Sequence, residues 1–328
     1  MAGFIVKRWG FRRNCLKPQR ILTENTELIM SKSILIAGGS GLVGRHLQAV
    51  LQKKGYQVRI LTRSPKTSEE FAWDPSRNFI DPQALENIDA VVNLAGAGIA
   101  DKPWTAARKK ELIDSRVQSA AVLEQALQQM KSPPKSYISA SAIGIYGNSG
   151  ERMMAESDAP VDASFMVECC QQWELAAGRI ASLGIRTVLL RIGIVLSPDG
   201  GALAEVARPV RFGIGSYFGN GQAWWSWIHL DDLCNMIVWS LENEQASGTY
   251  NAVAPHPVRG KALVKAVARA MKRPAIPVPA PAFVLRAVLG EMSAVILNSN
   301  LVSADKVIAA GFRFRFPEVQ EALNDLYS

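Results

Sequence analysis

The chain has 328 residues, of which 48% are hydrophobic and 20% charged, as is typical of a globular protein with a large core. The longest apolar stretch, 280–289, is short and is interrupted by Pro281 and Arg286, so we expect no transmembrane helix and no membrane partner. Half of the net charge of +8 lies in the first 29 residues, and the rest forms no cationic run, so we expect no nucleic-acid partner.

Residues 1–30 form a basic extension without clear periodicity. Two interpretations stay open. Either Met30, four residues ahead of an apolar run, is the true start and the extension is disordered or mis-assigned, or the extension is a targeting segment. Arg and Lys without acids before Glu24 favour targeting, whereas the lack of serine enrichment and of a secretory apolar region opposes it.

From Ser33 onward, apolar runs typical of buried parallel strands alternate with segments of helical spacing. We expect strands at 33–37, 57–62, 90–94, 136–139 and 187–191, and helices at 43–54, 104–130 and 168–181. Strands separated by helices of this length form βαβ units. The sequence therefore predicts an α/β fold, with a Rossmann-type doubly wound parallel sheet over residues 31–245.

The regular alternation of strand and helix patterns ends after Gly193. Glycines crowd between 200 and 221, an aromatic stretch follows at 224–227, and a helix is expected at 231–241. Proline-rich connections come later. We predict a smaller C-terminal α/β substrate lobe, which begins at about residue 196 and includes a small domain at 246–328.

A glycine-rich turn joins the first strand to the first helix. Gly38 allows a sharp turn, Gly41 lets the backbone approach a diphosphate, and Gly44 lets the helix pack closely on the sheet. The helix N-terminus adds free N–H groups and a positive partial charge. The alternative is a merely structural turn. The predicted phosphate-binding residues are Gly38, Gly39, Ser40, Gly41, Leu42, Val43 and Gly44.

The end of the second strand indicates which dinucleotide binds. NAD enzymes place an acidic residue here to bind the ribose hydroxyls. This chain has Thr62 and Arg63 and no acid. A guanidinium pairs well with a 2′-phosphate, so we predict NADP(H) rather than NAD(H) as cofactor. The alternative is a solvated surface arginine.

These motifs resemble those of the extended short-chain dehydrogenase/reductase superfamily. Three further matches are the segments 93–96, 139–147 and 227–233. With 73–75, 114–116 and 303–326, the chain is similar to the atypical "epimerase family protein" branch, which ends in a domain of unknown function. The resemblance implies NADP binding and no established substrate. It also implies cofactor-binding roles for Thr62, Arg63, Asn93, Leu94, Ala95, Gly96, Arg116 and Val195.

The chain departs from the superfamily at the catalytic helix. A Tyr-x-x-x-Lys pair normally supplies the proton and holds the nicotinamide ribose. Depending on register, this sequence has Met166 and Cys170, or Phe165 and Cys169, at those positions. The usual proton relay is therefore absent.

Substitute catalytic groups each have a structural alternative. Ser141 and Tyr146 are our candidates, with Ser139 as a further hydroxyl, although such residues also form turns and pocket walls. His229 titrates near neutrality. Asp231 or Asp232, however, stands where a helix N-cap is expected.

Two functions follow. The first is an NADP-dependent oxidoreductase or nucleotide-sugar-epimerase-like enzyme acting on a small-molecule substrate. The second is a non-catalytic NADP(H)-binding regulatory or sensor protein. The tryptophans at 224–227 suit ligand stacking or inter-lobe packing. Four cysteines without zinc spacing indicate no metal and a cytoplasmic location, and a homodimer is left open.

Overall fold

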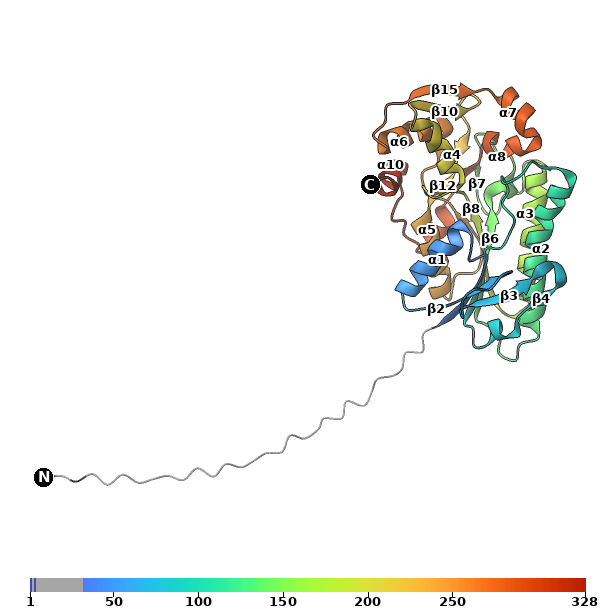
Figure 1. Cartoon of the computed structure of the whole chain (residues 1–328), viewed down its shortest axis with the longest axis vertical. Helices are drawn as coiled ribbons and strands as arrows, with labels where there is room; N and C mark the ends of the chain where they lie inside the picture. Colours follow the sequence, from blue (N-terminus) through green and yellow to red (C-terminus); the bar gives the residue numbers. More distant parts are fainter. Residues whose placement is uncertain (2, 4–31) are drawn as a thin grey trace. The chain divides into compact units, whose positions relative to one another are not determined.

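An eight-stranded sheet lies at the centre of the fold (Figure 1). The computed structural model describes residues 1, 3 and 32–328, so the expectations for the N-terminal extension lie outside the described residues. The strand order is β13 (Gly248–Ala252), β8 (Arg186–Ile192), β6 (Ser136–Ala142), β5 (Ala90–Asn93), β1 (Ser33–Ala37), β2 (Gln57–Thr62), β3 (Glu70–Asp74) and β4 (Phe79–Ile80). All neighbours are parallel except β3 and β4.

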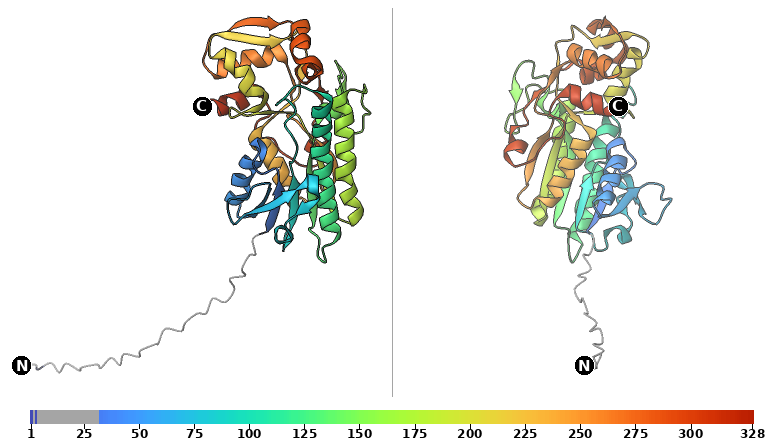
Figure 2. Two further views of the ribbon diagram at one scale, coloured as in Figure 1. Left: turned by 45° about the vertical axis from the view of Figure 1, so that its right-hand side comes forward. Right: turned by 90° about the vertical axis from the view of Figure 1, so that its left-hand side faces the viewer.

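Helices cover both faces of the sheet, because alternate strand residues point to opposite sides. Ile34 and Ile36 share a core with Leu47 of α1 (Leu42–Lys53). Leu35 shares a different core with Leu123 of α2 (Ala106–Gln128). α5 (Leu230–Glu242) lies with α1, and α3 (Phe165–Gly178) lies with α2, as Figures 1 and 2 show. The predicted doubly wound sheet is confirmed.

A second lobe has a core of its own, which includes Leu203, Trp227, Val267 and Leu323. It is built from α4 (Gly201–Val210), β10 (Ile214–Phe218), α6 (Gly260–Ala270), β15 (Ile276–Ala280), α7 (Ala282–Leu289), α8 (Ala294–Leu297) and α10 (Val319–Leu326). Strands β10 and β15 pair in parallel at the upper end of Figure 1. The chain therefore has a smaller α/β lobe beside the sheet, as expected. Its predicted bounds stay a prediction, and β13, within the predicted small domain at 246–328, belongs to the central sheet.

Short elements join these parts. The remaining strands are β7 (Met153–Met154), β9 (Ile194–Leu196), β11 (Trp224–Trp225), β12 (Trp227–His229), β14 (Val258–Arg259) and β16 (Leu301–Val302), and α9 (Asp305–Ala309) precedes α10. The 3-10 helices are η1 (Pro75–Arg77), η2 (Pro82–Leu85), η3 (Ile143–Tyr146), η4 (Arg179–Leu183) and η5 (Gly290–Ser293). Across residues 32–328, no helix combines the length and apolar character needed to cross a bilayer. The same residues contain no group of three or more His, Cys, Asp or Glu side chains placed to hold a metal ion.

Candidate functional site

A cavity of about 760 Å³ lies at the carboxyl ends of β1, β2 and β5. The chain runs from β1 to β2 on one side of β1, whereas β5 lies on the other side. Ligands of doubly wound sheets bind at such a reversal of strand order. Six of the predicted cofactor residues line this cavity: Gly38, Ser40, Thr62, Arg63, Ala95 and Gly96.

The glycine turn fits the roles expected for it. Gly38 has φ +83°, and a Cβ there would lie 2.7 Å from the carbonyl carbon of Leu94. A Cβ at Gly44 would lie 2.7 Å from Gly39 Cα, in the gap between α1 and the turn. Larger residues would therefore push the turn away from the sheet.

The N-terminus of α1 presents unused hydrogen-bond donors. Gly41 N–H donates to Gly38 O at 3.1 Å, and Arg45 N–H donates to Gly41 O at 3.0 Å. The amides of Leu42 and Val43 donate to no acceptor within the described residues. The first turn has no acidic residue and no side-chain cap. Such an end attracts anions, so the turn fits a dinucleotide diphosphate.

Two side chains of α1 hold the turn in place. Gln48 Nε2 donates to Gly39 O at 2.8 Å and to Gly44 O at 3.1 Å. Arg45 Nη1 donates to Ser40 O at 2.6 Å. The sequence analysis did not identify either residue, because their partners are backbone carbonyls that no motif specifies.

Arg63 is exposed at one end of the cavity. No carboxylate lies within 4 Å of its guanidinium in the part of the chain that the structure describes. The lining also includes Lys110, Asp114 and Gln118 of α2, to which the sequence analysis gave no cofactor role, although Asp114 begins the 114–116 match. Their spacing of four residues is a helical stripe that could have indicated them.

Asn93 is fully buried and holds the 93–96 motif in place from inside the fold. Its Nδ2 donates to Tyr137 Oη at 3.0 Å, and its Oδ1 accepts from Ala95 N–H at 3.1 Å. The side chain thus fixes the turn that follows β5. Leu94 contributes backbone packed against Gly38.

Arg116 lies half-buried beside Gly96. A Cβ added to Gly96 would lie 3.2 Å from Arg116 Cζ. Its guanidinium donates to Leu112 O at 2.8 Å and to Ala97 O at 3.1 Å, and lies 4.9 Å from the Trp173 ring. Burial lowers its pKa. Val195 of β9 pairs with Ile228 of β12 and packs against the core. Neither side chain lines the 760 Å³ cavity.

Ser141 and Tyr146 belong to a buried polar network. Ser141 Oγ donates to Glu174 Oε1 at 2.6 Å, and Arg191 bridges both Glu174 oxygens at 2.8 and 2.9 Å. Arg191 Nη1 also donates to Tyr146 Oη at 2.9 Å, which donates to Asn251 Oδ1 at 2.7 Å. Burial raises the pKa of Tyr146. A catalytic role for either residue stays a prediction.

The helix α3, where the resemblance places the Tyr-x-x-x-Lys pair, carries no phenol or ammonium at those positions. Cys170 is buried, which raises its pKa to about 12. Met166 lines a second cavity of about 550 Å³ between α3 and the segment from α7 to α8. Its polar lining includes Ser164, Arg286 and Asn298.

His229 is the N-cap of α5, so the expectation that Asp231 or Asp232 fills that position is wrong. His229 Nδ1 accepts from Asp231 N–H at 3.0 Å, and burial lowers the histidine pKa. Asp232 instead accepts from two backbone amides, at Arg315 and Phe316. Trp225 and Trp227 are buried in the core of the second lobe, which favours packing over ligand stacking for these two. Trp224 is half-buried, donates to Glu151 and lies 3.9 Å from the Arg259 guanidinium, so its role stays a prediction.

Comparisons with known proteins agree with this geometry. Residues 34–253 match the "NAD dependent epimerase/dehydratase family", and residues 280–326 match "Domain of unknown function (DUF1731)". The chain is 37% identical over 298 residues to the Epimerase family protein YfhF of Bacillus subtilis, covering 90% of this chain and 97% of that protein.

Two solved structures are similar over most of this chain. The human epimerase family protein SDR39U1 with NADPH has a TM-score of 0.81 at 28% identity, covering 90% of this chain and 99% of that chain. A nucleoside-diphosphate sugar epimerase from Corynebacterium glutamicum has a TM-score of 0.74 at 28% identity, covering 90% and 58%. The resemblance inferred from the motifs is confirmed.

Proposed function

The chain belongs to the NAD-dependent epimerase/dehydratase family, and from this premise we propose that it binds NADPH and is an oxidoreductase or epimerase-like enzyme acting on a small molecule. One observation carries the proposal: Gly38 and Ser40 of the glycine turn line the same cavity at the strand ends as Arg63. A nicotinamide dinucleotide accounts for both features, because it carries a diphosphate and, as NADPH, a 2′-phosphate.

Each end of the cavity suits one part of the cofactor. The free amides of Leu42 and Val43 bind the diphosphate, aided by the positive end of α1. Arg63 and Thr62 bind the 2′-phosphate. Glu111 lines the same cavity and interacts electrostatically with Arg63, but its ion pair is with Arg108, and within residues 32–328 no carboxylate lies within 4 Å of the Arg63 guanidinium. The similar human protein, whose structure holds NADPH, supports this choice.

The remaining predicted residues position the walls of the cofactor cavity or lie near it. Asn93 positions Ala95 and Gly96 beside the cofactor, and Leu94 holds the turn at Gly38. Arg116 and Val195 lie outside the cavity lining, and we keep them as proposed contacts of the nicotinamide half. Bound NADPH supplies a hydride.

The proposed substrate site lies beside Met166. The 550 Å³ cavity beside Met166 has the size of a small-molecule site, and its lining carries Arg286 together with Glu291, which is paired with Lys109. Ser141 and Tyr146 remain proposed proton-handling groups. Their hydroxyls are already bonded to Glu174, Arg191 and Asn251, so this role requires the network to rearrange.

The absence of the Tyr and Lys side chains at Met166 and Cys170 favours a second candidate, an NADP(H)-binding sensor without turnover. Two measurements separate the candidates. Calorimetry should show NADPH binding under either function. Incubation of stereospecifically deuterated NADPH with pools of carbonyl compounds and nucleotide sugars should release the label from one face if the protein is an enzyme. Retention of the label with every pool would contradict the enzymatic proposal.

A further inference from the structure

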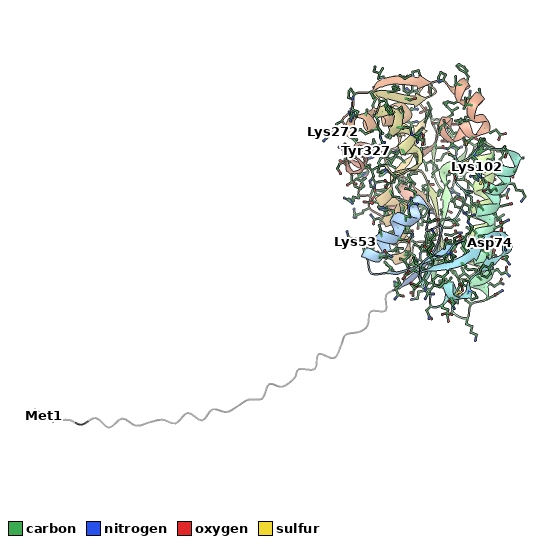
Figure 3. The ribbon with its side chains drawn as sticks, in the orientation of Figure 1. Met1, Lys53, Asp74, Lys102, Lys272 and Tyr327 are labelled. Atoms are coloured by element: carbon green, nitrogen blue, oxygen red, sulfur yellow. The ribbon has the colours of Figure 1, made fainter. Side chains whose placement is uncertain are left out.

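A further cavity, of about 450 Å³, lies between α6 and the paired strands β10 and β15, away from the cofactor cavity. We call it the basic groove and define it by its five cationic residues: Lys261, Lys265, Arg269, Lys272 and Arg273. No residue lines both this groove and the 760 Å³ cavity. Figure 3 places Lys272 at the edge of the upper lobe, far in that view from Asp74 of the cofactor cavity.

The charge of the groove is one-sided. Its lining contains five cations and no carboxylate, whereas the cofactor cavity is lined by two cations and three carboxylates. None of the five takes part in an ion pair within the described residues. The sequence explains the imbalance, since residues 245–290 contain no Asp or Glu. The groove is therefore far more selective for anions than the cofactor cavity.

The spacing of these cations does not stabilise α6. Lys261, Lys265 and Arg269 follow one another at four-residue spacing, where like charges repel and destabilise a helix. Lys261 also stands in the first turn of α6, next to the positive end of the helix dipole. The dipole accounts for cations near the C-terminal end of α6 but not for this one. An anion bound in the groove would offset both costs.

The residue just after the C-terminal end of α6 is a lysine in an unfavourable backbone conformation. Lys272 has φ +53°, a left-handed conformation that glycine or asparagine usually adopts after a helix. A lysine there costs conformational energy that the helix end does not require. Lys272 lines the basic groove, where its ammonium group adds to the positive charge available to an anion.

The shape of the groove fits a small ligand rather than a polymer. Its volume lies in the ordinary range of small-molecule sites. Val264, Ala268 and Pro277 provide an apolar floor between the cations, and the Lys261 ammonium lies 5.1 Å from the Tyr217 ring. We propose that the basic groove binds a small organic molecule that carries two or more phosphate groups. The phosphates pair with the cations, and the carbon skeleton lies on the apolar floor.

Inorganic tripolyphosphate is the probe for this site. Calorimetry on the full chain at low salt should show saturable binding that weakens as ionic strength rises. The double variant K265E/R269E should weaken this binding by at least about tenfold, since it removes two charge-assisted contacts and adds repulsion. NADPH affinity should change less than about twofold in the same variant, which separates the groove from the cofactor site.

Two further variants keep the test independent of folding and of net charge. K265Q/R269Q removes two cations without adding acids. It should unfold at or slightly above the wild-type temperature, because the repulsion along α6 is relieved, and should still bind tripolyphosphate more weakly. K131E/K135E changes the net charge equally at two exposed lysines outside the groove, and should leave tripolyphosphate binding unchanged. Absence of saturable binding, or equal weakening in K131E/K135E, would overturn the proposal. Sedimentation with phosphatidylglycerol vesicles that tripolyphosphate does not reverse would also overturn it, because the groove would then bind a lipid surface.

Discussion

Replacement of Arg63 by glutamine should change which nicotinamide dinucleotide the protein prefers. A hydrogen bond to a charged group contributes about 1.5–3 kcal/mol in proteins. Arg63 is exposed, so solvent screening reduces this contribution to about 1.4 kcal/mol, which is a factor of about ten in affinity. R63Q should therefore bind NADPH about tenfold more weakly and NADH equally well. R63E should weaken NADPH binding further, because its carboxylate repels the 2′-phosphate.

Calorimetric titration of each variant with both cofactors measures this change directly. K66Q is the matched control, since Lys66 is an exposed cation on the same loop that does not line the cavity. NADPH affinity in K66Q should stay within about twofold of the wild-type value. Equal weakening of NADPH and NADH in R63Q, or an unchanged NADPH preference in R63E, would refute the assignment of the 2′-phosphate to Arg63.

Three further substitutions test the site and its surroundings. G44A should lower the free energy of unfolding by about 1–3 kcal/mol and weaken NADPH binding, whereas G178A, whose new methyl meets no atom within 4 Å, should not; equal urea midpoints would contradict this. Y146F should cost about 1–3 kcal/mol of stability with unchanged NADPH affinity, since it leaves Asn251 Oδ1 without its donor; full stability with loss of turnover would instead establish Tyr146 as catalytic. Burial lowers the His229 pKa below its unfolded value of 6.5, so the stability that the neutral histidine contributes is present above pH 6.5 and is lost as pH falls. H229N keeps the N-cap acceptor and should flatten this decline of the free energy of unfolding, measured by urea titrations from pH 7 to 5. An unchanged slope would exclude His229 as its source.

The sheet could be predicted because strand and helix periods are local properties of the sequence. The strands at 33–37 and 57–62 have the predicted ends, since a glycine turn or a change of hydrophobic pattern marks each one. The glycine turn was predictable for the same reason. Its three glycines satisfy backbone constraints that other residues cannot meet.

Contacts between distant segments could not be predicted. Ser141 and Tyr146 were chosen because their residue types can move protons, but Glu174, Arg191 and Asn251 meet them only through the packing of β6, α3, β8 and β13. The N-cap of α5 was misassigned to aspartate because a histidine ring nitrogen accepts the same bond. The basic groove was missed because its five cations, all within residues 261–273, are spaced along α6 and just after it rather than in one run, and only the pairing of β10 with β15 shows that they line a cavity.

The central claim is that the amide groups at the start of α1 bind the cofactor diphosphate. Hydrogen–deuterium exchange followed by mass spectrometry tests it most directly, because the Leu42 and Val43 amides have no protein acceptor among residues 32–328 and should exchange rapidly in the free protein. Saturating NADPH should slow exchange in the peptide that contains them and leave the peptide that covers α6 unchanged. Unaltered exchange at the start of α1, under conditions where calorimetry detects bound NADPH, would contradict the account.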